Sequence, residues 1–307
     1  MFQMSNHLSV NQFFAIDGLR KLASLTADVD AAFSASVQKD ADALMDAVTT
    51  HTWNETTGRF CDGACIDAPH HGVTTNAWGL YLNVVPDERV ADTCADVAAW
   101  GNDGFGMYVR RVDIPQKGRG EAAAATRTVL LRHFVTTGAR RYGVFIYLSA
   151  LAACDVDDGT AMLTALTKCD DQSWCGELDV ATMTRENWVG GTYSHPWGTG
   201  ALQGIGAGVM GIRQTAPAWA TYTVKPKLGN LTFANILVPT SAGPIAVNAT
   251  PSSTVVSVPP NTRAEICVRG VAATLDGIAV DAHISNGYAC VGAGNGADGA
   301  PRVVVSV

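Results

Sequence analysis

Apolar residues recur at helical spacing in the first part of the chain. The first such stretch runs from Val10 to Leu25, and Asp28 and Asp30 precede a second stretch that continues to Val48. Apolar residues three and four positions apart lie on one face of a helix, and an aspartate just before the first of them is a typical N-cap. The two stretches therefore predict a helical hairpin in which each helix buries one face against the other.

The helical spacing continues to residue 212, interrupted by polar and glycine-rich loops. Trp53 and Phe60 lie in the first of these loops and are expected to pack at the end of the hairpin. The further predicted helices are Thr75–Leu82, Glu88–Trp100, Glu121–Thr136, Arg140–Ala153, Gly159–Leu166 and Thr199–Ile212, and the main loops are His51–Asp62 and Gly101–Gly120. Roughly eight helices in pairs favour part of an α/α toroid.

After Pro217 the pattern changes to alternating, β-branched segments separated by Pro and Gly. Such segments predict strands. They are Tyr222–Val224, Leu231–Phe233, Asn235–Val238, Ile245–Val247, Thr254–Val258, Ala264–Val268, Thr274–Ala282 and Arg302–Val307. The fold class predicted is mostly α followed by β: a partial toroid over residues 1–214 and a C-terminal antiparallel β-sandwich over residues 215–307.

Composition narrows the possible partners. The chain has 307 residues, of which 47% are hydrophobic and 16% charged, so it is globular and large enough for one or two cores. Its net charge of −7 argues against nucleic acid or an anionic membrane as the main partner. No apolar run approaches the length of a membrane span.

The cysteines point to an oxidising compartment. The chain has eight cysteines, including the close pairs Cys61/Cys65 and Cys169/Cys175. A half zinc site with His70 and His71 is the alternative, but disulfides are favoured, with Cys169–Cys175 and Cys267–Cys290 as the expected pairs. N-glycosylation sequons at Asn54, Asn230 and Asn248 add to the case for a secretory product.

The N-terminal residues do not form a signal peptide, because they contain neither a basic segment nor an apolar one. We therefore expect that the chain is the C-terminal part of a longer, secreted protein.

The chemistry concentrates between Met183 and Trp219. Glu186 lies between Arg185 and Trp188, and a glycine-rich loop separates it from Ser194–Gly198, which contains His195 and Trp197. Aromatic rings stack on the C–H faces of sugars, and polar groups orient the hydroxyls, so this mixture suits a sugar pocket. The alternative for Glu186 is an ordinary solvated carboxylate.

Five ordered motifs carry a resemblance to a known family. They are T-x-E-x-W (Thr184–Trp188), S-H-P-W-G (Ser194–Gly198), G-I-R-x-x-A-P (Gly211–Pro217), K-P-x-L-G-x-L (Lys225–Leu231) and V-P-T-x-x-G-x-I (Val238–Ile245). Together they resemble the α-L-rhamnosidases of glycoside hydrolase family seventy-eight, over nearly the whole chain. In that family a Trp more often directly precedes the acid, whereas here Trp188 follows Glu186 by two positions.

The resemblance implies roles for seven residues. Glu186 would be the general base of an inverting hydrolysis of α-L-rhamnosides, His195 would orient a sugar hydroxyl or the attacking water, and Trp188 and Trp197 would wall the pocket. The other candidate sugar contacts are Asn76, Trp78 and Trp174, and core packing is an equal alternative for the two tryptophans. The chemistry needs no cofactor or metal, with calcium left open.

The family carries its general acid in an upstream acidic motif that this sequence lacks, and its toroid needs six hairpins to close. We therefore expect that this chain alone does not hydrolyse rhamnosides. Two other functions stay open: a different α/α-toroid glycosidase, for example on arabinose or unsaturated uronides, and a non-catalytic carbohydrate-binding remnant.

Overall fold

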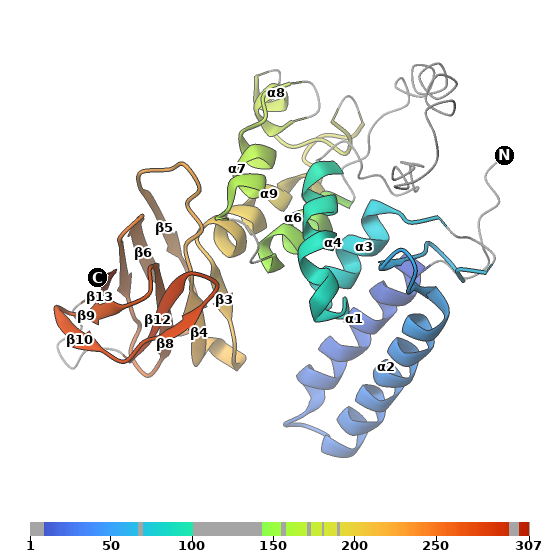
Figure 1. The fold of residues 1–307 in the computed structure, drawn as a ribbon, viewed down its shortest axis with the longest axis horizontal. Coiled ribbons are helices and arrows are strands. Elements are labelled where there is room, and N and C mark those ends of the chain that lie inside the picture. The colour runs from blue at the N-terminus through green and yellow to red at the C-terminus, as the bar shows by residue number, and fades with distance from the viewer. Residues whose placement is uncertain are drawn as a thin grey trace. The chain divides into compact units, whose positions relative to one another are not determined.

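The computed structural model describes residues 9–66, 70–100, 143–154, 158–170, 173–179, 181–188, 191–294 and 301–306. The predicted loop Gly101–Gly120 and the predicted helix Glu121–Thr136 lie outside these residues. The chain forms two compact units, one of Met1–Ala150 with Cys169–Gly198 and one of Leu151–Lys168 with Thr199–Val307. Helices dominate the first half of the chain and strands the second, as predicted (Figure 1). The domain boundary after residue 214 stays a prediction.

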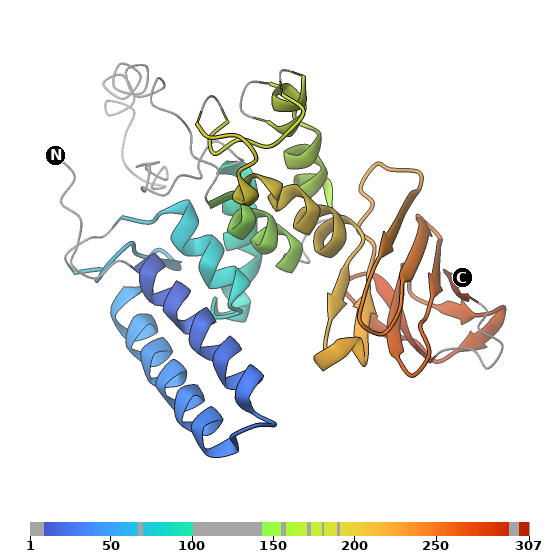
Figure 2. The same cartoon turned by 180° about the vertical axis from the view of Figure 1, so that it is seen from behind.

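The first unit begins with the predicted helical hairpin. Helices α1 (Ser9–Thr26) and α2 (Ala31–Thr52) lie side by side in both views (Figures 1 and 2). Asp30 caps α2, because its carboxylate accepts the Phe33 N–H at 2.9 Å. The buried residues along the pair are Phe13, Ile16, Ala23, Val37, Ala41, Met45 and Val48. Burial of this stripe holds the hairpin together, since isolated helices of this length are marginal in water.

A short β-hairpin closes the end of α2, where the pattern predicted only a loop with a turn. Strands β1 (Trp53–Asn54) and β2 (Arg59–Phe60) pair across a turn in which Gly58 adopts a φ of 63°. The Phe60 ring is fully buried and lies edge-to-face against Trp53 at 4.8 Å and Phe13 at 5.2 Å. The expected packing of Trp53 and Phe60 at the end of the helical hairpin is confirmed.

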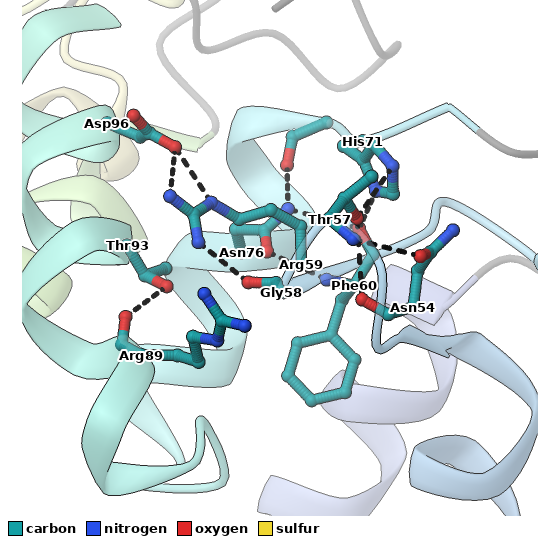
Figure 3. Close-up of polar contacts among 11 residues, drawn as sticks. Asn54, Thr57, Gly58, Arg59, Phe60, His71, Asn76, Arg89, Thr93 and Asp96 are labelled. Carbon is teal, nitrogen blue, oxygen red and sulfur yellow. Dashed lines mark hydrogen bonds and ion pairs between the residues drawn. The ribbon is translucent and has the colours of Figure 1, made fainter. Parts of the chain in front are cut away.

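Arg59 connects this β-hairpin to the next helices, α3 (Val73–Tyr81) and α4 (Asp87–Trp100). Its guanidinium is buried, and its Nε donates to Asp96 of α4 at 2.7 Å while its Nη1 donates to the Gly58 carbonyl at 2.7 Å (Figure 3). A buried charge is tolerated only when it is paired in this way.

Three later helices differ in how well the pattern predicted them. Helix α6 (Val144–Ala153) and helix α7 (Thr160–Thr167) match predicted helices. The predicted helix Thr199–Ile212 is wrong in its form: α9 (Gly200–Gln203) passes into a π-helix, η5 (Gly204–Val209). A Cβ on Gly208 would lie 2.4 Å from the Met162 methyl group of α7, so glycine at this position allows the two segments to approach closely.

The second unit contains two sheets. A six-stranded sheet has the order β10-β9-β13-β7-β6-β5, and a five-stranded sheet has the order β11-β12-β8-β4-β3. The strands are β3 (Ile212–Gln214), β4 (Thr221–Val224), β5 (Ala234–Val238), β6 (Ile245–Thr250), β7 (Ser253–Ser257), β8 (Arg263–Arg269), β9 (Ala273–Leu275), β10 (Ile278–Val280), β11 (His283–Ser285), β12 (Tyr288–Gly294) and β13 (Arg302–Ser306). All pairs are antiparallel except β4 with β8.

Alternation along the strands explains which side of each sheet is buried. Tyr222 and Val224 of β4 are buried while Thr223 between them is half-exposed, and Ile245 and Val247 of β6 repeat the pattern. The predicted strand Leu231–Phe233 is wrong. These residues follow a turn in which Gly229 has a φ of 52° and the Leu231 N–H donates to the Leu228 carbonyl at 2.8 Å.

Both expected disulfides, Cys169–Cys175 and Cys267–Cys290, are present, and Cys61–Cys65 is a third. No cysteine within the described residues is free. None of the described helices is long and apolar enough to cross a membrane.

The Arg59–Asp96 pair generates a stability prediction. Asp96→Ala should lower the free energy of unfolding by about 1.5–3 kcal/mol, because it leaves a buried guanidinium without its carboxylate. Asp92→Ala is the matched control, since Asp92 is exposed on the same helix and its replacement should change stability by no more than about 0.5 kcal/mol. Urea unfolding followed by circular dichroism measures both; equal losses would contradict the assigned role of the pair.

The disulfides generate a second prediction, through the chain entropy of the unfolded state. Replacing Cys267 and Cys290 by Ala should cost about 3 kcal/mol, because the bond joins residues 23 positions apart. The same double replacement at Cys61 and Cys65, only 4 positions apart, should cost about 2 kcal/mol. Urea unfolding of the two variants tests the order, and a larger loss for the shorter loop would contradict it.

Candidate functional site

The segment that carries the candidate base is supported by a one-turn helix, α8 (Trp174–Leu178). Ser173 caps it, with its hydroxyl accepting the Gly176 N–H at 3.1 Å. Glu177 on this helix is 1% exposed, accepts the Arg185 backbone N–H at 2.6 Å and faces the Arg185 guanidinium Nε at 3.7 Å. The buried carboxylate thereby fixes the backbone one residue before Glu186. Glu177 was not predicted from the sequence, because it belongs to no recognisable motif.

The chain from residue 184 to residue 195 folds back on itself. Arg185 and Tyr193 form an isolated antiparallel bridge, and the Glu186 N–H donates to the Thr192 carbonyl at 2.9 Å. At the Thr184 end, the His195 N–H donates to the Thr184 carbonyl and the Thr184 hydroxyl donates to the His195 carbonyl, each at 3.1 Å. These bonds place the side chains of Glu186 and His195 on neighbouring arms of one loop.

Gly191 allows the return of this loop. Its φ is 82°, and a Cβ there would lie 2.8 Å from the Glu186 Cβ. Both the left-handed backbone and the close approach require glycine.

Thr192 links the two polar side chains of the site. Its hydroxyl donates to Glu186 Oε2 at 3.3 Å and lies 2.7 Å from His195 Nδ1, and its N–H lies 3.4 Å from the same carboxylate oxygen. A hydroxyl that donates to Glu186 can only accept from His195, so Nδ1 is the nitrogen that donates to Thr192 and Nε2 is left to face a ligand. Glu186 and His195 are both half-exposed, so a ligand can reach them.

Trp197 completes the described part of this cluster. Its indole N–H donates to the Glu186 carbonyl at 2.9 Å, and its ring lies 4.0 Å from the His195 ring with the planes tilted by 37°. Trp197 and His195 are both half-buried, so part of each residue is accessible to solvent. An aromatic surface beside a carboxylate and an imidazole can hold a sugar and act on it.

The other two tryptophans near Glu186 are buried. Trp188 is 2% exposed and Trp174 is 8% exposed, and their rings pack edge-to-face at 5.1 Å. The Trp174 indole N–H donates to the Gly198 carbonyl at 2.7 Å. This packing favours the alternative given above, in which Trp174 belongs to the core, and it gives Trp188 the same supporting role behind the loop.

Asn76 and Trp78, on α3, are also buried. The Asn76 side chain is 0% exposed; its amide accepts the Phe60 N–H at 3.0 Å and donates to the Phe60 and Gly72 carbonyls at 3.1 and 2.9 Å (Figure 3). Trp78 is 5% exposed and packs edge-to-face against Phe14 and Tyr81. Asn76 therefore completes the hydrogen bonding of the β-hairpin, and Trp78 packs in the core. A direct sugar contact by either residue stays a prediction.

A second polar cluster lies beside Asn76. The buried Asp62 carboxylate accepts from the Gly72 N–H at 2.9 Å and the Thr75 hydroxyl at 2.5 Å, and it pairs with His70. Burial lowers the pKa of the neighbouring His71, whose Nδ1 lies 3.2 Å from the Phe60 carbonyl. These bonds fix the conformation of the loop, and they do not bring together accessible side-chain atoms that could bind a ligand.

One group of possible metal ligands lies close together within the described residues. It consists of Cys169, Cys175 and Asp179, with ligand atoms within 4.8 Å of one another. The two sulfurs are bonded to each other, so neither is the thiolate that a metal requires.

Comparison with known proteins places the fold. The family described as the bacterial alpha-L-rhamnosidase C-terminal domain matches residues 211–277. No curated protein sequence matches the chain.

Several solved structures of similar fold are described as rhamnosidases. The enzyme from Dictyoglumus thermophilum has a TM-score of 0.64 at 17% identity, over 95% of this chain and 31% of its own. The Streptomyces avermitilis enzyme, complexed with L-rhamnose, has a TM-score of 0.63 at 17% identity, over 96% and 26%. A family GH78 rhamnosidase of Bacillus sp. GL1 has a TM-score of 0.55 at 19% identity, over 78% and 23%.

The chain therefore resembles α-L-rhamnosidases in fold and spans about a third or less of the length of these structures. The structural likeness establishes the fold. Because the sequence identities are low, the activity and the site residues are proposals.

The loop geometry generates a prediction at Gly191. Gly191→Ala should speed amide exchange at Glu186 by at least about tenfold, because the new Cβ breaks the bond from the Glu186 N–H to Thr192 and the αL backbone costs about 1–2 kcal/mol. Gly18→Ala is the matched control, since a Cβ there meets nothing within 4 Å on α1 and should stabilise the helix by about 0.5–1 kcal/mol. Unchanged exchange at Glu186 in the first variant would contradict the described loop.

Proposed function

We propose that this chain carries the base half of an α-L-rhamnosidase-like glycoside hydrolase that removes terminal α-L-rhamnose from glycosides or polysaccharides with inversion. The observation that carries the proposal is the linkage of Glu186 to His195 through the Thr192 hydroxyl, beside the Trp197 ring. The fold and the match of residues 211–277 to a rhamnosidase domain support it.

The proposed step uses the ionised Glu186 carboxylate as general base. It takes a proton from a water molecule while that water attacks the anomeric carbon. The glycosidic C–O bond breaks, its electron pair goes to the leaving oxygen, and that oxygen needs a proton from an acid on the other side of the bond. In inverting enzymes the two carboxyl groups are about 6.5–9.5 Å apart, which leaves room for the water.

The neighbouring residues hold the sugar in this proposal. His195 accepts a hydrogen bond from a sugar hydroxyl at Nε2, and Trp197 stacks on the C–H face of the sugar ring. Trp188 and Trp174 support the loop from the core, and Asn76 and Trp78 hold the adjoining β-hairpin and helix in place. The proposed hydrolysis needs no cofactor.

The general acid is the missing part. The sequence holds no counterpart of the acidic motif that the resembled family uses, and Glu177 is buried against Arg185. Without an acid the leaving oxygen departs unprotonated, which costs about 10²–10⁴ in rate. This observation favours a second candidate function, a sugar-binding module without hydrolysis.

The compartment proposed is the secretory pathway or the cell exterior. The disulfides Cys61–Cys65, Cys169–Cys175 and Cys267–Cys290 support it, since such bonds persist in oxidising compartments. The sequon residues Asn230 and Asn248 are exposed, which N-glycosylation requires.

The test compares leaving groups. The sequence alone predicts no hydrolysis of rhamnosides by this chain, whereas the base in the proposed site should still support slow hydrolysis of 4-nitrophenyl α-L-rhamnoside. Methyl α-L-rhamnoside should react at least about 10²-fold more slowly still, because only the first leaving group departs readily without an acid. Glu186→Gln should lower kcat on the aryl substrate by at least about 10²-fold. Glu55→Gln, at an exposed position in the first unit, is the control and should leave kcat unchanged.

Each other outcome has a definite meaning. Near-normal turnover by Glu186→Gln removes Glu186 from the mechanism. Comparable rates on the two substrates show that the chain supplies its own acid. If neither substrate is hydrolysed but L-rhamnose binds, the second candidate function replaces the first.

A further inference from the structure

The second unit contains a cavity of about 240 Å³ that belongs to none of the features described above. It lies against the five-stranded sheet and is lined by both charged and hydroxyl side chains. The lining residues are Ala153, Ala207, Gly211, Arg213, Thr223, Lys225, Lys227, Glu265, Cys267, His283, Ser285 and Cys290.

Strand register places the polar lining residues in rows. Arg213 of β3 pairs with Thr223 of β4, which pairs in turn with Glu265 of β8. The next row has Cys267 of β8 opposite Cys290 of β12, which pairs with His283 of β11. Side chains at paired positions lie on the same face of a sheet, with neighbouring strands about 4.8 Å apart. The cavity thus follows from the topology and is not an accident of loop placement.

Alternation continues beyond the end of β4. Val224 points into the core, whereas Thr223, Lys225 and Lys227 share the opposite parity and line the cavity. The Lys225 N–H donates to the Gly211 carbonyl at 3.2 Å and the Lys227 N–H to the Val209 carbonyl at 2.8 Å, so backbone bonds fix this extension.

The cations are held by different contacts. Lys227 is 5% exposed, and its ammonium donates to the carbonyls of Ala152 and Cys154. The Arg213 guanidinium donates to the Ala152 carbonyl. The Lys225 ammonium lies 4.9 Å from the centre of the Tyr288 ring. Three cationic side chains and one carboxylate therefore line a single cavity on a chain of net charge −7.

We propose that this cavity binds the carboxylate-bearing residue of an acidic glycan, a uronate. Arg213 and Lys225 bind the carboxylate, and Thr223, Ser285 and Glu265 bind the sugar hydroxyls. Arg213 and Glu265 are exposed and Lys225 is half-exposed, so the ligand enters from solvent.

The shape and the acceptors favour a sugar acid over a simple anion. The volume is just below the range of about 300–1,000 Å³ that holds drug-sized ligands, so one small residue fits and the rest of the glycan extends outside. The Glu265 carboxylate repels a sulfate or chloride ion, whereas it can accept hydrogen bonds from the several hydroxyl groups that a uronate has and these ions lack. The choice of a saccharide rests on the proposed function, but the cavity belongs to the second unit and Glu186 to the first, and binding to the cavity is measured separately.

The experiment is calorimetric titration of the whole chain with sodium D-galacturonate, a trigalacturonate, D-galactose and sodium acetate at low and high salt. Galacturonate and trigalacturonate should both bind, because the cavity takes a single uronate residue. Galactose and acetate should bind at least about tenfold more weakly than galacturonate. Affinity for galacturonate should fall as salt rises, because exposed charges are screened. Binding of the trimer alone would show that an extended surface, not this cavity, takes the ligand.

Three variants make the test specific. Arg213→Gln and Lys225→Gln should each weaken galacturonate binding by about tenfold, the effect of losing one charge-assisted hydrogen bond. Glu265→Gln should strengthen it, because the change removes a like charge and keeps an acceptor. Damage to the fold cannot produce effects of opposite sign. Arg263→Gln is the matched control, since Arg263 is exposed on β8 outside the cavity lining and its loss should leave the affinity unchanged.

Equal affinities for galactose and galacturonate, or a uniform response to all four variants, would overturn the inference. The result is independent of hydrolysis. If the chain binds galacturonate but cleaves no rhamnoside, the uronate site is supported and the proposed function is contradicted. If it cleaves rhamnosides but does not bind galacturonate, the proposed function is supported and the uronate site is contradicted.

Discussion

The buried Glu177 carboxylate fixes the candidate site. A charge removed from water must be paired and hydrogen-bonded, and here the partners are the backbone and the guanidinium of Arg185. Because Glu186 is the next residue, the direction of its side chain depends on this pair. The Arg185–Tyr193 bridge and the left-handed Gly191 then return the chain so that Thr192 reaches the Glu186 carboxylate and the His195 ring contacts Thr192. A half-exposed functional group thus depends on a fully buried one.

The parts of the fold that depend on periodicity were predictable from the sequence. The α1–α2 pair, the Asp30 cap and most strands of the second unit follow from where apolar residues recur. Elements fixed by tertiary contacts were not. The π-helix Gly204–Val209 has no sequence signal that distinguishes it from an α-helix, although its Gly208 lies against Met162. Strand β12 (Tyr288–Gly294), with its two glycines and small side chains, has no strong strand signal of its own.

The candidate site was predictable only in part, for a related reason. A motif names residues but does not say which of their faces meets solvent. Glu186, His195 and Trp197 are accessible and close together, whereas Trp188, Trp174, Trp78 and Asn76 are buried. Thr192 and Glu177, which connect and anchor the site, belong to no motif and become visible only through their hydrogen bonds.

In the proposed site, the loop of Glu186, Thr192, His195 and Trp197 holds a rhamnose residue beside a base. The decisive experiment is a crystal structure of the whole chain with L-rhamnose. We expect the sugar stacked on the Trp197 ring, one hydroxyl within hydrogen-bond distance of His195 Nε2, and a water between the Glu186 carboxylate and the anomeric carbon. Rhamnose bound elsewhere with this loop bare, or a Glu186 carboxylate turned away from the bound sugar, would contradict it.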